Sequence, residues 1–332
     1  MRRALLAALV LAAGAAAAQS RVNKLGAMLA EGFADQGFWR LATGPVKVAP
    51  TKDGGTVTAK QKFQARLSRI DLEATKCEDL FPAGAQQLVL TVHGIGGAGE
   101  EWEPALGNLA ANNTPLLMYR WLPTGSREGI ASSLADGINR LQECLAGNSR
   151  RLLVFGHSAG GVLGATAAAS VKPDDDSIAD SIAIVTVAAP LGGMGMKDKA
   201  KRGWTTFVEE LGTDLRSYKA AAPGVRVLHV RTHPQADSYA LNSSPVGHEE
   251  GWPVPGVPGA RAVDLDETVN HEQAIAFAAA ALKQDLWKLW APAGTPVPPP
   301  APTPAQPEPA PKPEQKPTRP IPTAPPGQPV RL

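Results

Sequence analysis

The sequence predicts an α/β fold in which helices cover both faces of a mostly parallel central sheet. Short apolar runs alternate along the chain with segments whose apolar residues recur at helical spacing, the pattern of repeated βα units. Several runs are apolar throughout, as expected of strands buried on both faces. One run leads directly into a G-x-S-x-G motif and then into a helix of small residues.

Composition sets the outer bounds on function. The chain has 332 residues, of which 43% are hydrophobic and 19% charged, enough for one sizeable core. The net charge is +2 and no basic stripe with interleaved aromatic residues is present, so no nucleic-acid partner is expected.

The N-terminus has the pattern of a secretory signal peptide. A basic start at residues 1–3 precedes an apolar core at residues 4–13 and an A-x-A-like site just before Gln19. The apolar core is too short to span a membrane. The cleavage site has no cysteine to which a lipid could be attached, so a lipid anchor is not expected. We therefore expect residues 1–18 to be removed and the protein to be exported, either periplasmic or secreted.

The remaining elements are expected in chain order. Residues 56–59 and 63–72 suggest an antiparallel hairpin at a sheet edge, and no role follows for residues 37–39. Further strands are expected at residues 88–92, 116–121, 152–155, 182–188, 225–230 and 261–265. Helices are expected at residues 102–111, 132–145, 161–171, 204–218 and 274–289.

The C-terminal end has a different composition. Residues 291–332 hold more than half of the chain's 31 prolines and cannot bury a core. We expect this segment to be disordered and to serve as a spacer, with a contact to the cell envelope or a partner as the alternative. The domain prediction is thus a signal peptide at 1–18, one α/β domain at 19–290 and a tail at 291–332.

The serine of the G-x-S-x-G motif is the candidate nucleophile. Ser158 lies on a turn between strand 152–155 and the next helix, a turn so tight that side chains at Gly156 and Gly160 would strike its neighbours. A helix N-terminus at this place favours the negative charge that develops in acyl transfer.

A serine nucleophile needs a base, and the base needs an acid that orients it. Among six histidines, His271 follows the last strand and stands just before the closing helix, on the rim expected for Ser158. His248 is the alternative base. The expected acid is Asp237, which follows strand 225–230, with Asp264 and Asp266 as rivals.

These motifs resemble the α/β-hydrolase fold, and in particular its lipase and esterase branch. The resemblance rests on the glycine-rich turn at residues 93–97, the motif at residues 156–160, and the order Ser158, Asp237, His271, and it covers roughly residues 88–290. It implies an oxyanion hole formed by the backbone N–H groups of Ile95 and Ala159. Residues 194–218 lie where such lipases carry a lid, although an ordinary packing helix fits equally.

The resemblance also implies a disulfide. Cys77 precedes strand 88–92, and Cys144 precedes strand 152–155. These strands are neighbours in α/β-hydrolases, so we expect a Cys77–Cys144 bond near the sheet edge opposite the active site.

The functional prediction is an exported serine hydrolase that acts on carboxylic or lipid esters through an acyl-enzyme. Transfer of the acyl group to another acceptor, and a non-catalytic binding protein on the same scaffold, are the alternatives. The chemistry needs no cofactor. The acidic run at residues 174–176 lacks the spaced oxygen ligands of a calcium site, and we expect no metal.

Overall fold

The computed structural model describes residues 36–48, 56–95, 97, 99–110, 114–145, 150–172, 181–193, 206–211, 218–233, 236–237 and 256–280. The chain divides into two compact units, Met1–Pro296 and Val297–Leu332, and every described residue belongs to the first. The predicted signal peptide, the proline-rich tail and His248 lie outside the described residues. No helix in the described ranges is long and apolar enough to cross a membrane.

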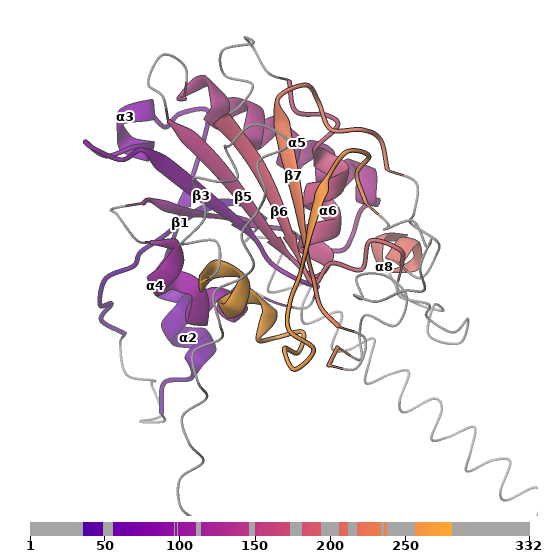
Figure 1. Cartoon of the computed structure of the whole chain (residues 1–332). Helices are drawn as coiled ribbons and strands as arrows, with labels where there is room; N and C mark the ends of the chain where they lie inside the picture. Colours follow the sequence, from indigo (N-terminus) through magenta and orange to yellow (C-terminus); the bar gives the residue numbers. More distant parts are fainter. Residues whose placement is uncertain are drawn as a thin grey trace, which may run out of the picture. The chain divides into compact units, whose positions relative to one another are not determined.

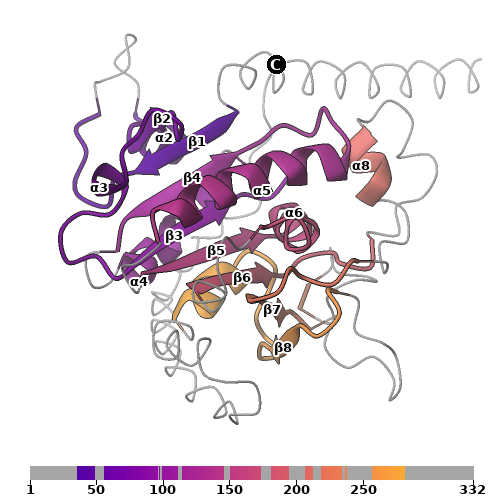
Figure 2. The same ribbon diagram turned by 90° about the horizontal axis from the view of Figure 1, so that it is seen from above.

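Eight strands form one mixed sheet with the order β2-β1-β4-β3-β5-β6-β7-β8 (Figures 1 and 2). All neighbours from β4 to β8 are parallel, and β1 is antiparallel to both β2 and β4. The mostly parallel sheet predicted from the apolar runs is therefore confirmed. The strands are β1 (Gly37–Leu41), β2 (Leu67–Ile70), β3 (Gln87–Val92), β4 (Leu116–Arg120), β5 (Arg151–His157), β6 (Ile182–Val187), β7 (Val225–Arg231) and β8 (Arg261–Asp264).

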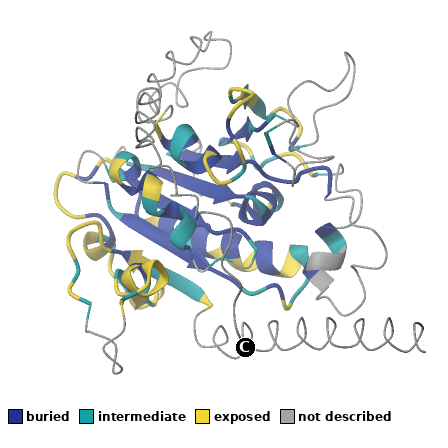
Figure 3. Ribbon diagram, turned by 90° about the horizontal axis from the view of Figure 1, so that it is seen from below, coloured by how far each residue is buried: buried dark blue, intermediate teal, exposed yellow. Residues whose placement is uncertain are grey.

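Helices cover both faces of the sheet (Figures 1 and 2). One face packs against α5 (Arg127–Glu143), α6 (Ala159–Ala167) and α8 (Thr206–Leu211). The other packs against α2 (Ala59–Gln64), the 3-10 helix η1 (Glu100–Ala105), α4 (Leu106–Leu109) and the helical residues 274–280. The central strands are almost wholly buried (Figure 3).

The alternation of side chains along β5 explains why its run is apolar throughout. Leu152 and Val154 belong to the core under α5 and α6, whereas Leu153 and Phe155 belong to the core under η1 and α4. Successive side chains point to opposite faces, so a strand covered on both sides needs apolar residues at every position.

The hairpin predicted for residues 56–72 is wrong. Residues 59–64 form α2, which begins at a capping box: the Gln61 N–H donates to Thr58 Oγ1, and the Thr58 N–H donates to Gln61 Oε1. The partner of β2 is β1, which contains residues 37–39, for which the sequence suggested no role. The Thr58-x-x-Gln61 cap thus outweighs the local alternation of apolar residues.

The predicted disulfide is confirmed. Cys77 and Cys144 are bonded across a sequence separation of 67 residues, with their Cα atoms 5.1 Å apart. Cys77 begins α3 (Cys77–Leu80), which leads into β3, and Cys144 follows α5, which leads into β5. The bond therefore joins the connections that enter two neighbouring parallel strands.

The other ends of the parallel strands lie in register at one edge. Val92 pairs with Gly156, His157 with Val187, and Val187 with Val230. After β3 the chain moves to β4 on one side, and it then returns across β3 to form β5 on the other. Ligands of open α/β sheets bind outside the carboxyl ends of the strands at such a reversal.

Candidate active site

Ser158 lies at this reversal, between the last residue of β5 and the first residue of α6. Its backbone angles are φ 52° and ψ −126°, a region that residues with a side chain rarely adopt. Its N–H donates to the carbonyl oxygen of Val187 at the end of β6, and its own carbonyl accepts from Gly161 and Val162 as the helix begins. Such a conformation costs about 1–3 kcal/mol and persists only where the surroundings impose it.

The two glycines of the motif permit this turn, as the sequence predicted. A Cβ at Gly156 would lie 2.6 Å from the carbonyl oxygen of Gly160, which is backbone of α6. A Cβ at Gly160 would lie 2.4 Å from the carbonyl oxygens of both Val92 and His93. Only glycine at these two positions lets α6 approach β5 and the end of β3 this closely.

His271 and Asp237 are paired on the same edge of the sheet. His271 Nδ1 lies 2.8 Å from Asp237 Oδ2, and the Asp237 side chain is completely buried while that of His271 is 15% exposed. The hydroxyl of Thr232 donates to the same oxygen at 2.7 Å. Asp237 follows β7 and His271 follows β8, so a carboxylate from one loop holds an imidazole from the next.

Thr232 was not found by sequence reasoning. It is fully buried at the residue after β7, and its hydroxyl helps fix the carboxylate that holds His271. A lone threonine at a strand end carries no pattern of its own.

The rival acids have other partners. Asp264 bonds to the Arg231 side chain at 2.5 Å, and Asp266 accepts from the N–H and hydroxyl of Thr268. The Thr268 bonds lower the pKa of the exposed Asp266. Both carboxylates therefore form hydrogen bonds at the surface near β8, whereas the Asp237 carboxylate contacts His271.

The glycine-rich turn after β3 is held by its own histidine. His93 Nε2 accepts from the Trp121 N–H at 3.1 Å, so the ring hydrogen is on Nδ1, which donates to the Gly94 carbonyl at 2.7 Å. Burial lowers the pKa of His93 to about 4, which keeps the ring neutral. Carbonyl and N–H of one trans peptide point in opposite directions, so fixing the Gly94 oxygen also fixes the direction of the Ile95 N–H.

A buried carboxylate holds the preceding peptide of this turn. Glu101 Oε1 accepts from the Gly94 N–H at 2.8 Å, and a Cβ at Gly97 would lie 2.8 Å from Glu101 Oε2. Burial raises the pKa of Glu101. Sequence reasoning missed this residue, because Glu100, Glu101 and Glu103 read alike as the acidic first turn of a helix.

The second predicted oxyanion donor is at the start of α6. Ala159 is the first residue of that helix, where backbone N–H groups have no acceptor within the helix. Ala159 is buried and Ile95 is partly exposed, and a Cβ on Gly94, the residue before Ile95, would lie 3.2 Å from the Ser158 Cβ. Their joint role toward a substrate oxygen stays a prediction.

The described part of the segment 194–218 packs as an ordinary helix. In α8, Phe207 and Leu211 are buried in the core shared with α5 and α6. The Phe207 ring meets the edge of Trp121 at a centroid distance of 4.7 Å, and Trp121 stacks on His93. Residues 194–205 and 212–217 lie outside the described residues.

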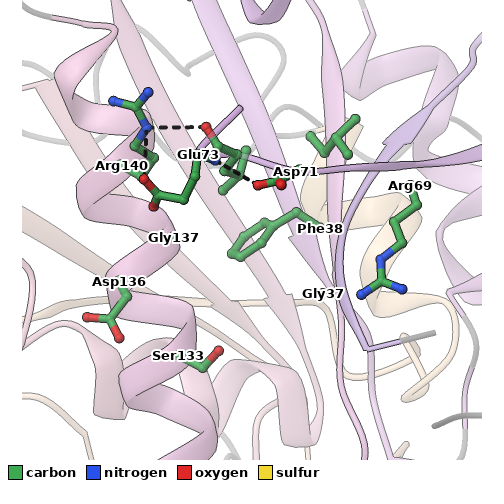
Figure 4. Close-up of a pocket in the computed structure, with 11 residues that line it drawn as sticks. Gly37, Phe38, Arg69, Asp71, Glu73, Ser133, Asp136, Gly137 and Arg140 are labelled. Atoms are coloured by element: carbon green, nitrogen blue, oxygen red, sulfur yellow. Dashed lines mark hydrogen bonds and ion pairs between the residues drawn. The ribbon is translucent and has the colours of Figure 1, made fainter. Parts of the chain in front are cut away.

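A separate groove of about 710 Å³ lies between β1, β2 and α5 (Figure 4). Charged side chains of both signs line it, among them Arg69, Asp71, Asp136 and Arg140. None of the site residues described above contributes to it. Within the described ranges, no three His, Cys, Asp or Glu side chains are grouped so as to hold a metal ion.

Comparisons with known proteins find similarity only at the level of solved structures. No protein-family model and no curated protein sequence matches the chain. The mature form of Bacillus licheniformis lipase BlEst2 is 14% identical, with a TM-score of 0.44, over 63% of this chain and 94% of that one. Aspergillus fumigatus lipase B is 15% identical, with a TM-score of 0.43, over 61% of this chain and 52% of that one.

Esterase 2 of Thermogutta terrifontis, in its apo form, is 14% identical, with a TM-score of 0.39, over 63% of this chain and 85% of that one. All three TM-scores are below 0.5. The strand order, the helices on both faces and the elbow after β5 are those of an α/β-hydrolase fold.

Proposed function

We propose that this protein is a serine hydrolase that cleaves carboxylic esters through an acyl-enzyme on Ser158. The observation that carries the proposal is the conformation of Ser158. A serine with φ 52° stands on a strand–helix turn, on the sheet edge that also presents the Asp237–His271 pair. Backbone strain at a single nucleophilic residue next to such a pair is typical of a nucleophile elbow.

The proposed mechanism begins with proton transfer. Asp237 accepts from His271 Nδ1–H, which leaves Nε2 of the ring as the basic atom. His271 takes the Ser158 proton as Oγ attacks the ester carbonyl. The N–H groups of Ile95 and Ala159 stabilise the negative oxygen of the tetrahedral intermediate.

The second half of the cycle uses the same groups. His271 gives its proton to the departing alcohol, and the acyl group stays on Ser158. His271 then activates a water molecule that releases the acid. The Asp237 carboxylate, held by Thr232, stabilises the imidazolium form of His271 in each half.

We also propose that the protein is exported, periplasmic or secreted. The N-terminal pattern at residues 1–18 supports this, and so does the Cys77–Cys144 bond, since disulfides persist in oxidising compartments. The N-terminus of protein recovered outside the cytoplasm tests it, and we expect Gln19. An intact residue 1 on all of the protein, in the cytoplasm, would contradict export.

Hydrolysis of p-nitrophenyl esters of increasing acyl length tests the activity. We expect the full chain to hydrolyse at least part of the series and Ser158→Ala to lose at least about a thousandfold in kcat. Ser132→Ala, an exposed serine on α5, is the matched control and should keep the wild-type rate. Equal rates for Ser158→Ala and wild type would refute the proposal.

A further inference from the structure

His157 immediately precedes the nucleophile and contacts the loop that carries the base. Its side chain is 5% exposed, and its Nε2 lies 3.1 Å from the backbone carbonyl oxygen of His271. The two imidazole rings lie beside each other with their centroids 4.7 Å apart and their planes 52° apart. The mechanism above uses Ser158 and His271 but gives His157 no part.

The contact fixes the protonation of the His157 ring. A carbonyl oxygen only accepts, so Nε2 carries the hydrogen and donates it. Nδ1 is buried and has no hydrogen-bond partner in the described part of the chain, so a second proton there would be both charged and unpaired. Burial, and then the charge of His271, lower the pKa of His157 to about 3.

The surroundings of His157 come from four elements. His271 and Asp237, from the loops after β8 and β7, are the titratable groups that act on it. The uncharged ring of Trp102 in η1 meets it edge-on at 6.4 Å, and Gly94 of the β3 turn would place a Cβ 3.5 Å from its Nδ1. The ring is therefore packed among groups from η1 and the β3 turn as well as against His271, and His157 as a whole is 5% exposed.

We propose that His157 is a positioning residue that sets the place of His271 relative to Ser158. β5 lies in the middle of the sheet and pairs along its length with β3 and β6, so its backbone is held by hydrogen bonds on both sides. The Nε2–H bond ties the main chain of His271 to this strand at the residue next to the nucleophile. Asp237 fixes the His271 ring through Nδ1, and His157 fixes its backbone.

This inference rests on the proposed function, since it concerns the base of that reaction. The test compares His157→Gln with His157→Met in the full chain. The two side chains are similar in length and volume, but only glutamine can donate from the place of Nε2. The rate of Ser158 modification by a fluorophosphonate, kcat and KM for a p-nitrophenyl ester, and the melting temperature are measured for both.

We expect His157→Met to lower kcat and the modification rate by about 10- to 100-fold, the size expected when a reacting group is misplaced by about 1 Å. KM should change by less than about threefold, because His271 acts mainly in the transition state. His157→Gln should recover most of the rate. Equal rates for the two variants, at equal melting temperatures, would overturn the proposal, because a side chain that only fills space does not depend on a donor.

A measurement on the wild-type protein covers the case in which a variant does not fold. Nitrogen-15 NMR of histidine-labelled protein distinguishes the two neutral tautomers of His157. We expect the Nε2–H form at neutral pH, and an Nδ1–H form would overturn the proposal. If the fluorophosphonate fails to modify the wild-type protein, the proposed hydrolase activity fails, while the tautomer still decides whether His157 holds the His271 backbone.

Discussion

Replacing Gly160 by alanine adds one methyl group where α6 begins against the end of β3. The new Cβ would lie 2.4 Å from the carbonyl oxygens of Val92 and His93, well inside contact distance. Both atoms belong to the backbone and no rotamer relieves the overlap, so helix and strand end must separate. Overpacking of this kind costs about 1–3 kcal/mol, and the helical preference of alanine returns about 1 kcal/mol at most.

We therefore expect Gly160→Ala to lower the free energy of unfolding by about 2 kcal/mol or more, given that backbone and not side chain must yield. The same shift moves the turn that presents Ile95, so kcat should fall at least about tenfold. Gly107→Ala in α4 is the matched control, because a Cβ there meets nothing within 4 Å. Urea unfolding and ester hydrolysis measure both effects. A Gly160→Ala protein as stable and active as Gly107→Ala would refute the close approach of α6 to β3.

Three further predictions concern the acid, the disulfide and the buried histidines. Asp237→Asn should lower kcat by about 10⁴-fold, since the amide favours the wrong His271 tautomer, and an unchanged kcat would assign the acid elsewhere. Replacing Cys77 and Cys144 by alanine should cost about 4 kcal/mol by loop entropy while kcat is kept, and an unchanged melting temperature would contradict this. Stability should fall as the pH drops from 6.5 toward 4, by about 1.4 kcal/mol per pH unit for each buried histidine. In the unfolded chain these histidine side chains have a pKa of 6.5, so on acidification they take up protons before those of the folded protein do. Equal urea midpoints at pH 7 and pH 5 would contradict the burial of His93, His157 and His229.

The sequence pattern was plainest for the strands that are buried on both faces. β3, β5 and β6 are covered on both faces, so most of their residues are apolar and the runs were plain. The prediction failed at the sheet edge formed by β1 and β2. β1 and β2 are partly exposed, their composition is mixed, and their pairing joins residues 37–41 to residues 67–70 across α2.

In the candidate site, too, some residues could be inferred from the sequence and others could not. Ser158, Asp237 and His271 could be inferred because each follows a recognisable strand, and parallel strands bring such positions to one edge. The supporting contacts could not be inferred. Thr232 and Glu101 act through hydrogen bonds of 2.7 and 2.8 Å, and distances of that kind depend on how loops close, not on any local pattern.

The central claim is that Ser158 is an activated nucleophile. Incubating the purified protein with a fluorophosphonate, and reading the intact mass beside Ser158→Ala, tests it most directly. The account predicts one covalent adduct on the wild-type protein and none on the variant. A folded wild-type protein that gains no adduct, or a Ser158→Ala protein that gains the same one, would contradict it.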